Sequence, residues 1–177
     1  YRTGCALSPC PRWSHATTEP TPALSVADRD HLKVQLKSTE DLLYVSQPVI
    51  GRASGQWSVQ FTRRFLNKDG TIGGVVVASL NPAHFTSFYD KIDLGTSGAI
   101  SLIGSDGVVR ASGGNAADRY ALGQDINGTP LARHMRAEGG ATFQDKNPSS
   151  RESRLVTIRK VRGHPLWVSV SVDESDI

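Results

Sequence analysis

The chain has 177 residues, a formal net charge of +3 and 38% hydrophobic residues, which is typical of one or two globular domains and excludes a disordered chain. Its 20 Lys and Arg residues are interleaved with 17 Asp and Glu residues, a pattern that argues against a nucleic-acid partner. No run of eighteen apolar residues occurs, so we expect any transmembrane helix to lie outside the segment. A start at Tyr1 instead of Met indicates a piece of a longer protein.

The N-terminal segment, residues 1–27, carries four prolines among Ser and Thr and has no sustained apolar period. This composition predicts an irregular segment. Cys5 and Cys10 both lie within it, and the sequence leaves open whether they form a disulfide.

The first half of the chain predicts one short helix followed by strands. In residues 28–36, Leu32 and Leu36 stand four apart among polar residues, as on a surface helix. Aromatic, β-branched or alternating residues then predict strands at 43–50, 57–62 and 72–80.

The second half predicts the same kind of unit after a connecting helix. Asn81-Pro82 is a helix start, because the Asn side chain caps the helix and proline suits its first position, and Gly95 is expected to end it. A hairpin is expected at 99–111 around the Asp106-Gly107 turn. The remaining predicted elements are a helix at 130–137 and strands at 141–144, 154–161 and 166–172.

Catalytic motifs are absent from the sequence. It contains no dinucleotide or phosphate loop, no H-E-x-x-H and no C-x-x-C. The histidines occur singly, at His15, His31, His84, His134 and His164. We therefore expect no metal, no cofactor and no enzymatic activity of the segment itself.

Several stretches together resemble a double Cache sensor domain of the PDC type in their order and spacing. They are 24–31, 43–55, 57–64, 69–80, Phe85, Phe88, Tyr89, 93–95, 105–110, 122–125 and 165–166. The resemblance implies an α+β fold of PAS-like antiparallel sheets flanked by helices, in two tandem Cache modules of which the first is incomplete. It places a partial membrane-distal module at 28–80, a connecting helix at 81–95 and a membrane-proximal module at 96–177.

The same resemblance implies a ligand-sensing domain of a bacterial signal-transduction receptor, periplasmic or extracellular and anchored in the inner membrane by helices outside this segment. A small molecule would bind the distal module and signal to a cytoplasmic output such as a diguanylate cyclase or histidine kinase. The alternative is a non-sensing scaffold or dimerisation module of the same fold. A homodimer stays open under both interpretations.

The amino-acid-binding branch of this family carries Arg, Trp and Tyr in the segment that matches Arg29 to Leu32, and an Asp after the last distal strand. This sequence keeps Arg29, but His31 and Leu32 replace the aromatic pair and Ser79 stands where the Asp would be. An ammonium group would lose its charge-assisted partner there, which costs roughly 1.5 to 3 kcal/mol. Free amino acids are therefore not the expected ligand.

The remaining polar residues favour a small organic acid, because arginine prefers planar carboxylate partners. The candidate ligand-binding residues are Arg29, His31, Tyr44, Ser46, Trp57, Arg63 and Ser79. Side chains alternate along a strand, so Arg63 and Arg64 point to opposite faces, and the sequence does not decide which of them faces the ligand. Trp57 also suits the core, and the arginines also suit ion pairs at the rim.

Overall fold

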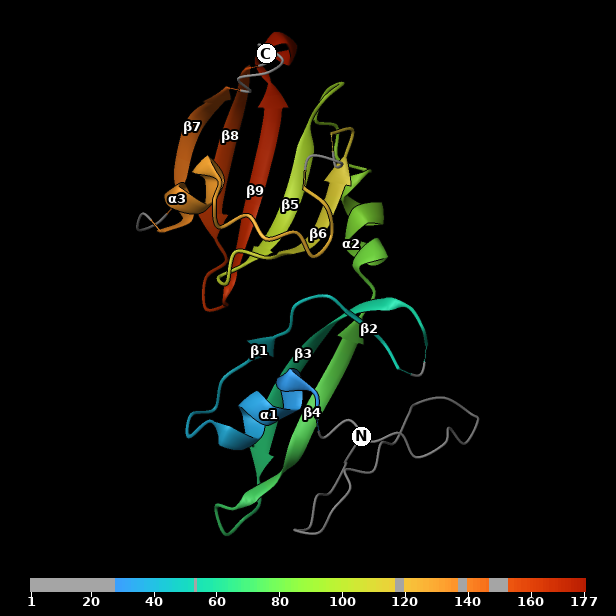
Figure 1. Cartoon of the computed structure of the whole chain (residues 1–177), viewed down its shortest axis with the longest axis vertical. Helices are drawn as coiled ribbons and strands as arrows, with labels where there is room; N and C mark the ends of the chain where they lie inside the picture. Colours follow the sequence, from blue (N-terminus) through green and yellow to red (C-terminus); the bar gives the residue numbers. More distant parts are fainter. Residues whose placement is uncertain (1–27, 53, 117–119, 137–139, 147–152) are drawn as a thin grey trace. The chain divides into compact units, whose positions relative to one another are not determined.

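The structure, a computed structural model, describes residues 28–52, 54–116, 120–136, 140–146 and 153–177 (Figure 1). The predictions for residues 1–27, including the Cys5 and Cys10 pair, lie outside the described residues. Contacts divide the chain into two units: unit 1 ends at Leu80 and unit 2 begins at Asn81. None of the helices in the described ranges is long and apolar enough to span a membrane.

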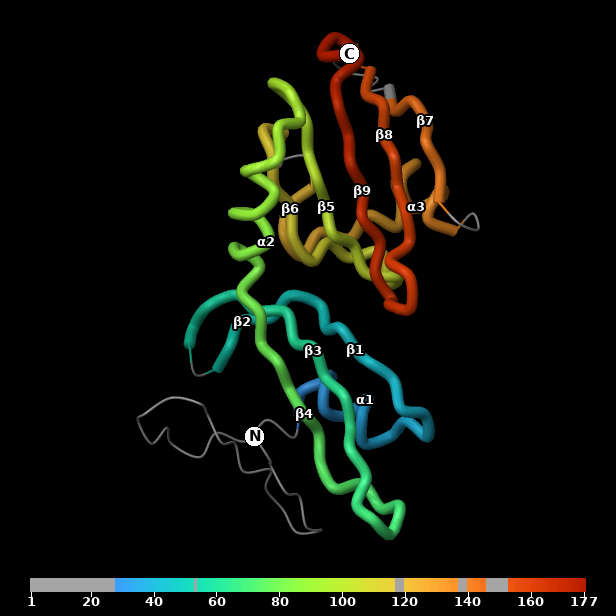
Figure 2. Tube along the Cα trace, turned by 180° about the vertical axis from the view of Figure 1, so that it is seen from behind, coloured from blue at the N-terminus to red at the C-terminus, as the bar shows by residue number. Residues whose placement is uncertain are grey.

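Unit 1 is a four-stranded antiparallel sheet with one helix. Its elements are α1 (Asp30–Lys37), β1 (Tyr44–Val45), β2 (Val49–Ile50), β3 (Trp57–Leu66) and β4 (Ile72–Leu80). The long strand β3 is central: β4 pairs with one of its edges, and β1 and β2 share the other. Helix α1 covers one face of β3 and β4, as the two opposite views show (Figures 1 and 2).

The single strand predicted at 43–50 is wrong, because the chain leaves the sheet between β1 and β2. Pro48 has no N–H with which to continue a ladder. At this break the Ser46 hydroxyl accepts a hydrogen bond from the backbone N–H of Gln60 at 2.9 Å. A side chain thus occupies the place of a missing backbone partner.

Unit 2 is a five-stranded antiparallel sheet in the order β6-β5-β9-β8-β7. Its elements are α2 (Pro82–Tyr89), β5 (Ala99–Gly104), β6 (Val109–Gly114), α3 (Pro130–Arg136), β7 (Ala141–Lys146), β8 (Ser153–Lys160), β9 (Leu166–Asp173) and the 3₁₀ turn η2 (Glu174–Asp176). All five strands predicted for this half are confirmed, although several are longer than predicted.

Helix α2 begins as predicted and ends early. The Asn81 side chain accepts a hydrogen bond from the Ala83 N–H at 3.0 Å, and proline follows it. The helix stops at Tyr89, so the prediction that it continues to Gly95 is wrong. Beyond Tyr89 the backbone makes shorter i to i+3 bonds, such as Ile92 N–H to Tyr89 C=O at 2.9 Å, which tighten the chain into a turn.

The core of unit 2 lies between the sheet and α3. Its buried members are Ile103, Val109, Ile126, Leu131, Ala132, Met135, Val156, Ile158 and Trp167. Helix α2 packs near β6 instead, where Thr86 Oγ1 donates to the Ser112 carbonyl at 2.8 Å. Helix α2 contacts β6 at one edge of the sheet, whereas α3 contacts β7 and β8 at the other. The two helices therefore lie at different parts of the sheet (Figure 1).

The hairpin between β5 and β6 has the predicted turn. Gly107 adopts a φ of 78°, which disfavours residues with a Cβ. Both terminal nitrogens of the buried Arg110 donate to the Asp106 carboxylate at 2.9 Å. Asp106 and Arg110 therefore hold this turn in shape.

Candidate functional site

A row of buried polar side chains runs along β3 on the face toward α1. Ser58, Gln60 and Thr62 alternate along the strand and are only 8%, 5% and 1% exposed. Buried polar groups need hydrogen-bond partners, so each side chain in such a row must be held by its neighbours or by a ligand.

Gln60 is the centre of this row. Its Oε1 accepts a hydrogen bond from Ser79 Oγ on β4, and its Nε2 donates to Ser58 Oγ at 2.8 Å. Ser58 Oγ in turn donates to the Val49 carbonyl at 3.3 Å. These contacts orient the carboxamide and, within the described ranges, use one of the two Nε2 hydrogens, so the second hydrogen can be given to a ligand.

Hydrogen bonds from Gln35 and Thr62 attach α1 to β3. Gln35 is 1% exposed, and its Nε2 donates to the Thr62 carbonyl at 2.8 Å and to the Leu42 carbonyl at 3.0 Å. Thr62 Oγ1 donates to the His31 carbonyl at 3.0 Å. The backbone of His31 is thereby fixed beside the polar row.

The His31 side chain carries a buried nitrogen with an unmet hydrogen bond. The residue is 5% exposed, and its Nε2 has no partner among the described residues. Burial lowers the pKa of His31 below its usual 6.5, and the charge of Arg29 lowers it further. The neutral imidazole therefore presents one unsatisfied polar atom, which costs about 1 to 3 kcal/mol unless another group meets it.

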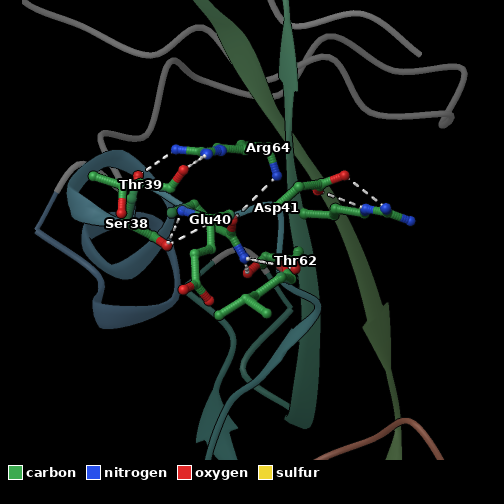
Figure 3. Close-up of polar contacts among 9 residues, drawn as sticks. Ser38, Thr39, Glu40, Asp41, Thr62 and Arg64 are labelled. Atoms are coloured by element: carbon green, nitrogen blue, oxygen red, sulfur yellow. Dashed lines mark hydrogen bonds and ion pairs between the residues drawn. The ribbon is translucent and has the colours of Figure 1, made fainter.

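Three arginines surround this part of unit 1 in different ways. Arg64 lies on the α1 face of β3 and donates to the Ser38 and Thr39 carbonyls at the C-terminal end of α1 (Figure 3). Arg63, on the opposite face, makes a two-pronged ion pair with Asp41 at 2.8 and 2.7 Å. The bonds from Arg63 lower the pKa of the Asp41 carboxyl below 3.8. Arg29 donates only from Nη2, to the Ile50 carbonyl at 3.1 Å, in the contacts of the described residues.

The structure brings together some of the candidate residues and separates others. Ser46 and Ser79 both contact Gln60, and His31 is joined to the same strand through Thr62. Tyr44 pairs directly opposite Thr62, so it shares the α1 face. Trp57 pairs with Ile50 at the start of β3 and is 46% exposed, so it does not belong to the core.

Sequence reasoning missed four members of this cluster: Gln35, Ser58, Gln60 and Thr62. The alternation of Ser58, Gln60 and Thr62 with apolar residues was visible, but it is also the usual pattern of a strand whose polar face meets water. The helix that covers this face is short and polar, and its Gln35 gave no signal of burial.

Comparison with known proteins decides the family. Residues 82–171 match the dCache_1-like family, described as a histidine kinase sensor domain. The chain belongs to this family. The predicted resemblance to Cache sensor domains and the predicted α+β fold of antiparallel sheets are confirmed. No curated protein matches the chain significantly.

Solved structures share the fold of this Cache-type chain. The extracellular domain of rpHK1S-Z16, named as a histidine kinase, is 28% identical with a TM-score of 0.75, over 89% of this chain and 64% of that one. The ligand-binding domain of the Pseudomonas fluorescens chemoreceptor CtaA with L-leucine is 15% identical with a TM-score of 0.63, over 90% and 64%. The ligand-binding domain of Mlp24 with asparagine is 14% identical with a TM-score of 0.58, over 89% and 60%.

The family match and the 28%-identical extracellular domain support a sensing role and an extracytoplasmic location for this Cache-type chain. The chain spans less than two thirds of the length of each of the three solved domains.

Proposed function

We propose that the chain binds a small organic acid in unit 1, in the layer between α1 and β3. The observation that carries this proposal is the His31 Nε2 atom, which is buried and has no partner among the described residues; the carbonyl of the same residue is bonded to Thr62 of the polar row. A buried polar atom of this kind is met in most proteins by water or by a ligand. In a sensor domain, a ligand gives the atom a function.

The charges around His31 favour an acid. Arg29 stands at the start of α1, and its hydrogen bond to the Ile50 carbonyl uses one of its five donors, so the guanidinium can still hold a carboxylate. The neutral imidazole and the free Gln60 Nε2 hydrogen can hydrogen-bond the other polar groups of the acid. We expect Tyr44 and Ser46 to border the same space.

Free amino acids fit this space less well. CtaA with L-leucine and Mlp24 with asparagine show that this fold holds amino acids. Here the position holds Ser79, which is uncharged and whose hydroxyl donates a hydrogen bond to Gln60. It therefore offers no anion to an ammonium group. An acid without an amine avoids the cost of an unpaired ammonium.

The rest of the proposal concerns the whole receptor. Unit 1 is the membrane-distal module, unit 2 the membrane-proximal one, and α2 connects them. The chain is a periplasmic segment of a bacterial inner-membrane protein whose transmembrane helices lie outside it. The cytoplasmic output is a histidine kinase or a diguanylate cyclase, and the family description favours the kinase.

Calorimetric titration of the chain with acetate, lactate, succinate and citrate tests the ligand class. We expect saturable binding of at least one acid, weakened roughly tenfold to a hundredfold by Arg29→Ala, because a hydrogen bond to a charged group is worth about 1.5 to 3 kcal/mol. His31→Phe keeps an aromatic ring but removes both ring nitrogens, and should weaken binding about tenfold. Arg162→Ala and His164→Phe change exposed residues of the β8–β9 turn and serve as matched controls.

Two results would contradict the proposal. If no acid binds, the scaffold alternative is favoured and the His31 nitrogen is met by water. If an amino acid binds more tightly than the matching acid without the amine, the interpretation of Ser79 is wrong.

A further inference from the structure

Two arginines join the start of α1 to β2 and to the turn after it. Arg29 donates from Nη2 to the Ile50 carbonyl at 3.1 Å. Two residues beyond Ile50, Arg52 donates from both terminal nitrogens to the Asp28 carboxylate, from Nη1 at 2.8 Å. Asp28 directly precedes Arg29, so both guanidinium groups belong to one contact between the two segments. We call these four residues the α1–β2 junction.

The junction is next to the polar row of the acid site. Ser58, the first member of the row, donates to the carbonyl of Val49, the residue before Ile50 in β2. His31 lies in the first turn of α1, two residues after Arg29, and its Nε2 is the buried atom without a partner among the described residues. For a ligand held by Arg29 and His31, Arg52 is therefore a neighbouring cation.

Asp28 occupies Arg52 as a carboxylate. The hydrogen bonds from Arg52 lower the pKa of the Asp28 carboxyl below 3.8, and the charge of Arg29 lowers it as well, so the group is ionised at neutral pH. Within the described ranges no carboxylate forms an ion pair with Arg29. A net positive charge thus remains at the junction, which favours an anionic ligand.

The ion pair between Asp28 and Arg52 is open to exchange. The two side chains are 58% and 40% exposed, and such pairs contribute little to stability because water and salt screen both charges. The turn that carries Arg52 has its own closure, since the Gly51 N–H donates to the Gln56 carbonyl at 2.9 Å. A ligand carboxylate can replace that of Asp28 on Arg52 with the same two-pronged geometry.

We propose that Arg52 holds the second carboxylate of a dicarboxylic acid, and that Asp28 occupies Arg52 until this ligand binds. This role rests on the acid site proposed above and narrows its ligand class: one carboxylate meets Arg29 and His31, and the other meets Arg52. Asp28 then sets the preference for two carboxylates over one, because a ligand with a single carboxylate offers Arg52 nothing in exchange for Asp28.

Calorimetric titration with succinate and succinamate at constant ionic strength tests this role. The two compounds share a carbon chain, but succinamate carries a carboxamide in place of one carboxylate. At about pH 7.5 both carboxyl groups of succinate are ionised. We expect succinate to bind about tenfold more tightly, because a guanidinium pairs more strongly with a carboxylate than with an amide. Arg52→Gln should abolish most of this preference and leave the affinity for succinamate unchanged.

Two matched variants separate the ion pair from the general effect of charge. Asp28→Asn and Asp30→Asn each remove one negative charge from the start of α1, but the Asp30 carboxylate lies 3.9 Å from Lys33 Nζ and does not hold Arg52. Asp28→Asn should raise the preference for succinate about threefold, since the competitor for Arg52 is gone. Asp30→Asn should raise it much less.

Equal affinities for succinate and succinamate, or a preference that survives Arg52→Gln, would overturn the role of Arg52 and leave the acid site in place. An equal rise in Asp28→Asn and Asp30→Asn would mean that Asp28 acts through net charge and does not compete for Arg52. Binding of acetate or lactate without binding of succinate would exclude a dicarboxylic acid. If none of these acids binds, the acid site itself is overturned.

Discussion

The interiors of the two units differ in composition: unit 1 buries mostly polar side chains and unit 2 mostly hydrophobic ones. Among the described residues, unit 1 buries three hydrophobic side chains, Leu32, Val45 and Val59, against six polar ones. Unit 2 buries sixteen hydrophobic side chains and also six polar ones. Burial of apolar area is non-directional, whereas hydrogen bonds require fixed geometry.

This difference suits a sensor. An interior that depends on hydrogen bonds changes when a ligand offers new partners, and unit 1 has unmet capacity at His31. An apolar interior, such as the core cluster of unit 2, has no polar groups for a ligand to pair with and keeps its packing when a ligand binds. We therefore expect ligands to act on unit 1 and large core truncations to act on unit 2.

The largest expected effect is on the apolar core. Ile103 is completely buried in unit 2, and Ile103→Ala should lower the free energy of unfolding of that unit by about 2 to 5 kcal/mol. Urea unfolding monitored through the fluorescence of Trp167, a member of the same core, measures this loss. Ile50→Ala, at a residue 52% exposed, is the control and should cost much less. Equal losses in the two variants would contradict the comparison.

The polar interior of unit 1 is tested by Gln35→Leu. The variant keeps the size of the side chain but leaves the Thr62 carbonyl and the Arg64 N–H without their partner. Each unsatisfied buried group costs about 1 to 3 kcal/mol, so amide hydrogen exchange in α1 should accelerate strongly. The exposed Gln56→Leu is the matched control. Unchanged protection of α1 in Gln35→Leu would mean that apolar contacts hold the helix.

An effect of pH on the stability of unit 1, of intermediate size, is expected from His31. The pKa of His31 is lowered in the folded state. As the pH falls, the unfolded chain therefore binds a proton at about pH 6.5, whereas the folded chain binds it only at a lower pH. The stability of unit 1 should be full above pH 6.5 and fall as the pH drops below it, until the lowered pKa is reached. Urea unfolding of unit 1 at about pH 7.5 and about pH 5.5 measures the slope. The slope should shrink in His31→Phe and persist in His164→Phe; a slope of opposite sign would contradict the account.

The smallest effect is expected at the C-terminal end of unit 2. The Asp176 carboxylate accepts hydrogen bonds from Thr96 and Ser97, and these bonds, that of the Thr96 side chain most, lower its pKa below 3.8. Its contribution is present above pH 3.8 and is lost as the pH falls through the lowered pKa. Asp176→Asn should therefore reduce the acid sensitivity of the melting temperature slightly. Identical melting temperatures of the two proteins at about pH 7, where the carboxylate is ionised, would show that the contact contributes nothing.

Local signals in the sequence predicted most of the strands. Alternating or continuous apolar residues placed β3, β4 and the strands of unit 2, and Asn81-Pro82 placed the start of α2. The end of α2 was missed because a tight turn after Tyr89, and not Gly95, stops the helix. The division of the first strand was missed although Pro48, which has no N–H for the ladder, was visible in the sequence; the Ser46–Gln60 hydrogen bond at the break joins residues fourteen apart and was not.

The candidate site was harder to predict than the fold. His31 and Ser79 were recognised as departures from a family pattern, which needs only the sequence. The burial of Gln60 and Gln35 depends on which face of β3 the helix covers, and a strand with one polar face does not reveal that a polar helix will cover it. The alternation did predict that Arg63 and Arg64 point to opposite faces of β3. The structure shows that Arg64 is the one that binds the C-terminal end of α1 (Figure 3).

The central claim is that unit 1 is the module that binds an acid. Its most direct test is a map of amide chemical shifts over the whole chain during titration with the small acids. We predict saturable shifts in α1 and β3, strongest near His31 and Gln60, with the core of unit 2 unchanged. Shifts confined to residues 81–177, or none that saturate, would contradict the claim.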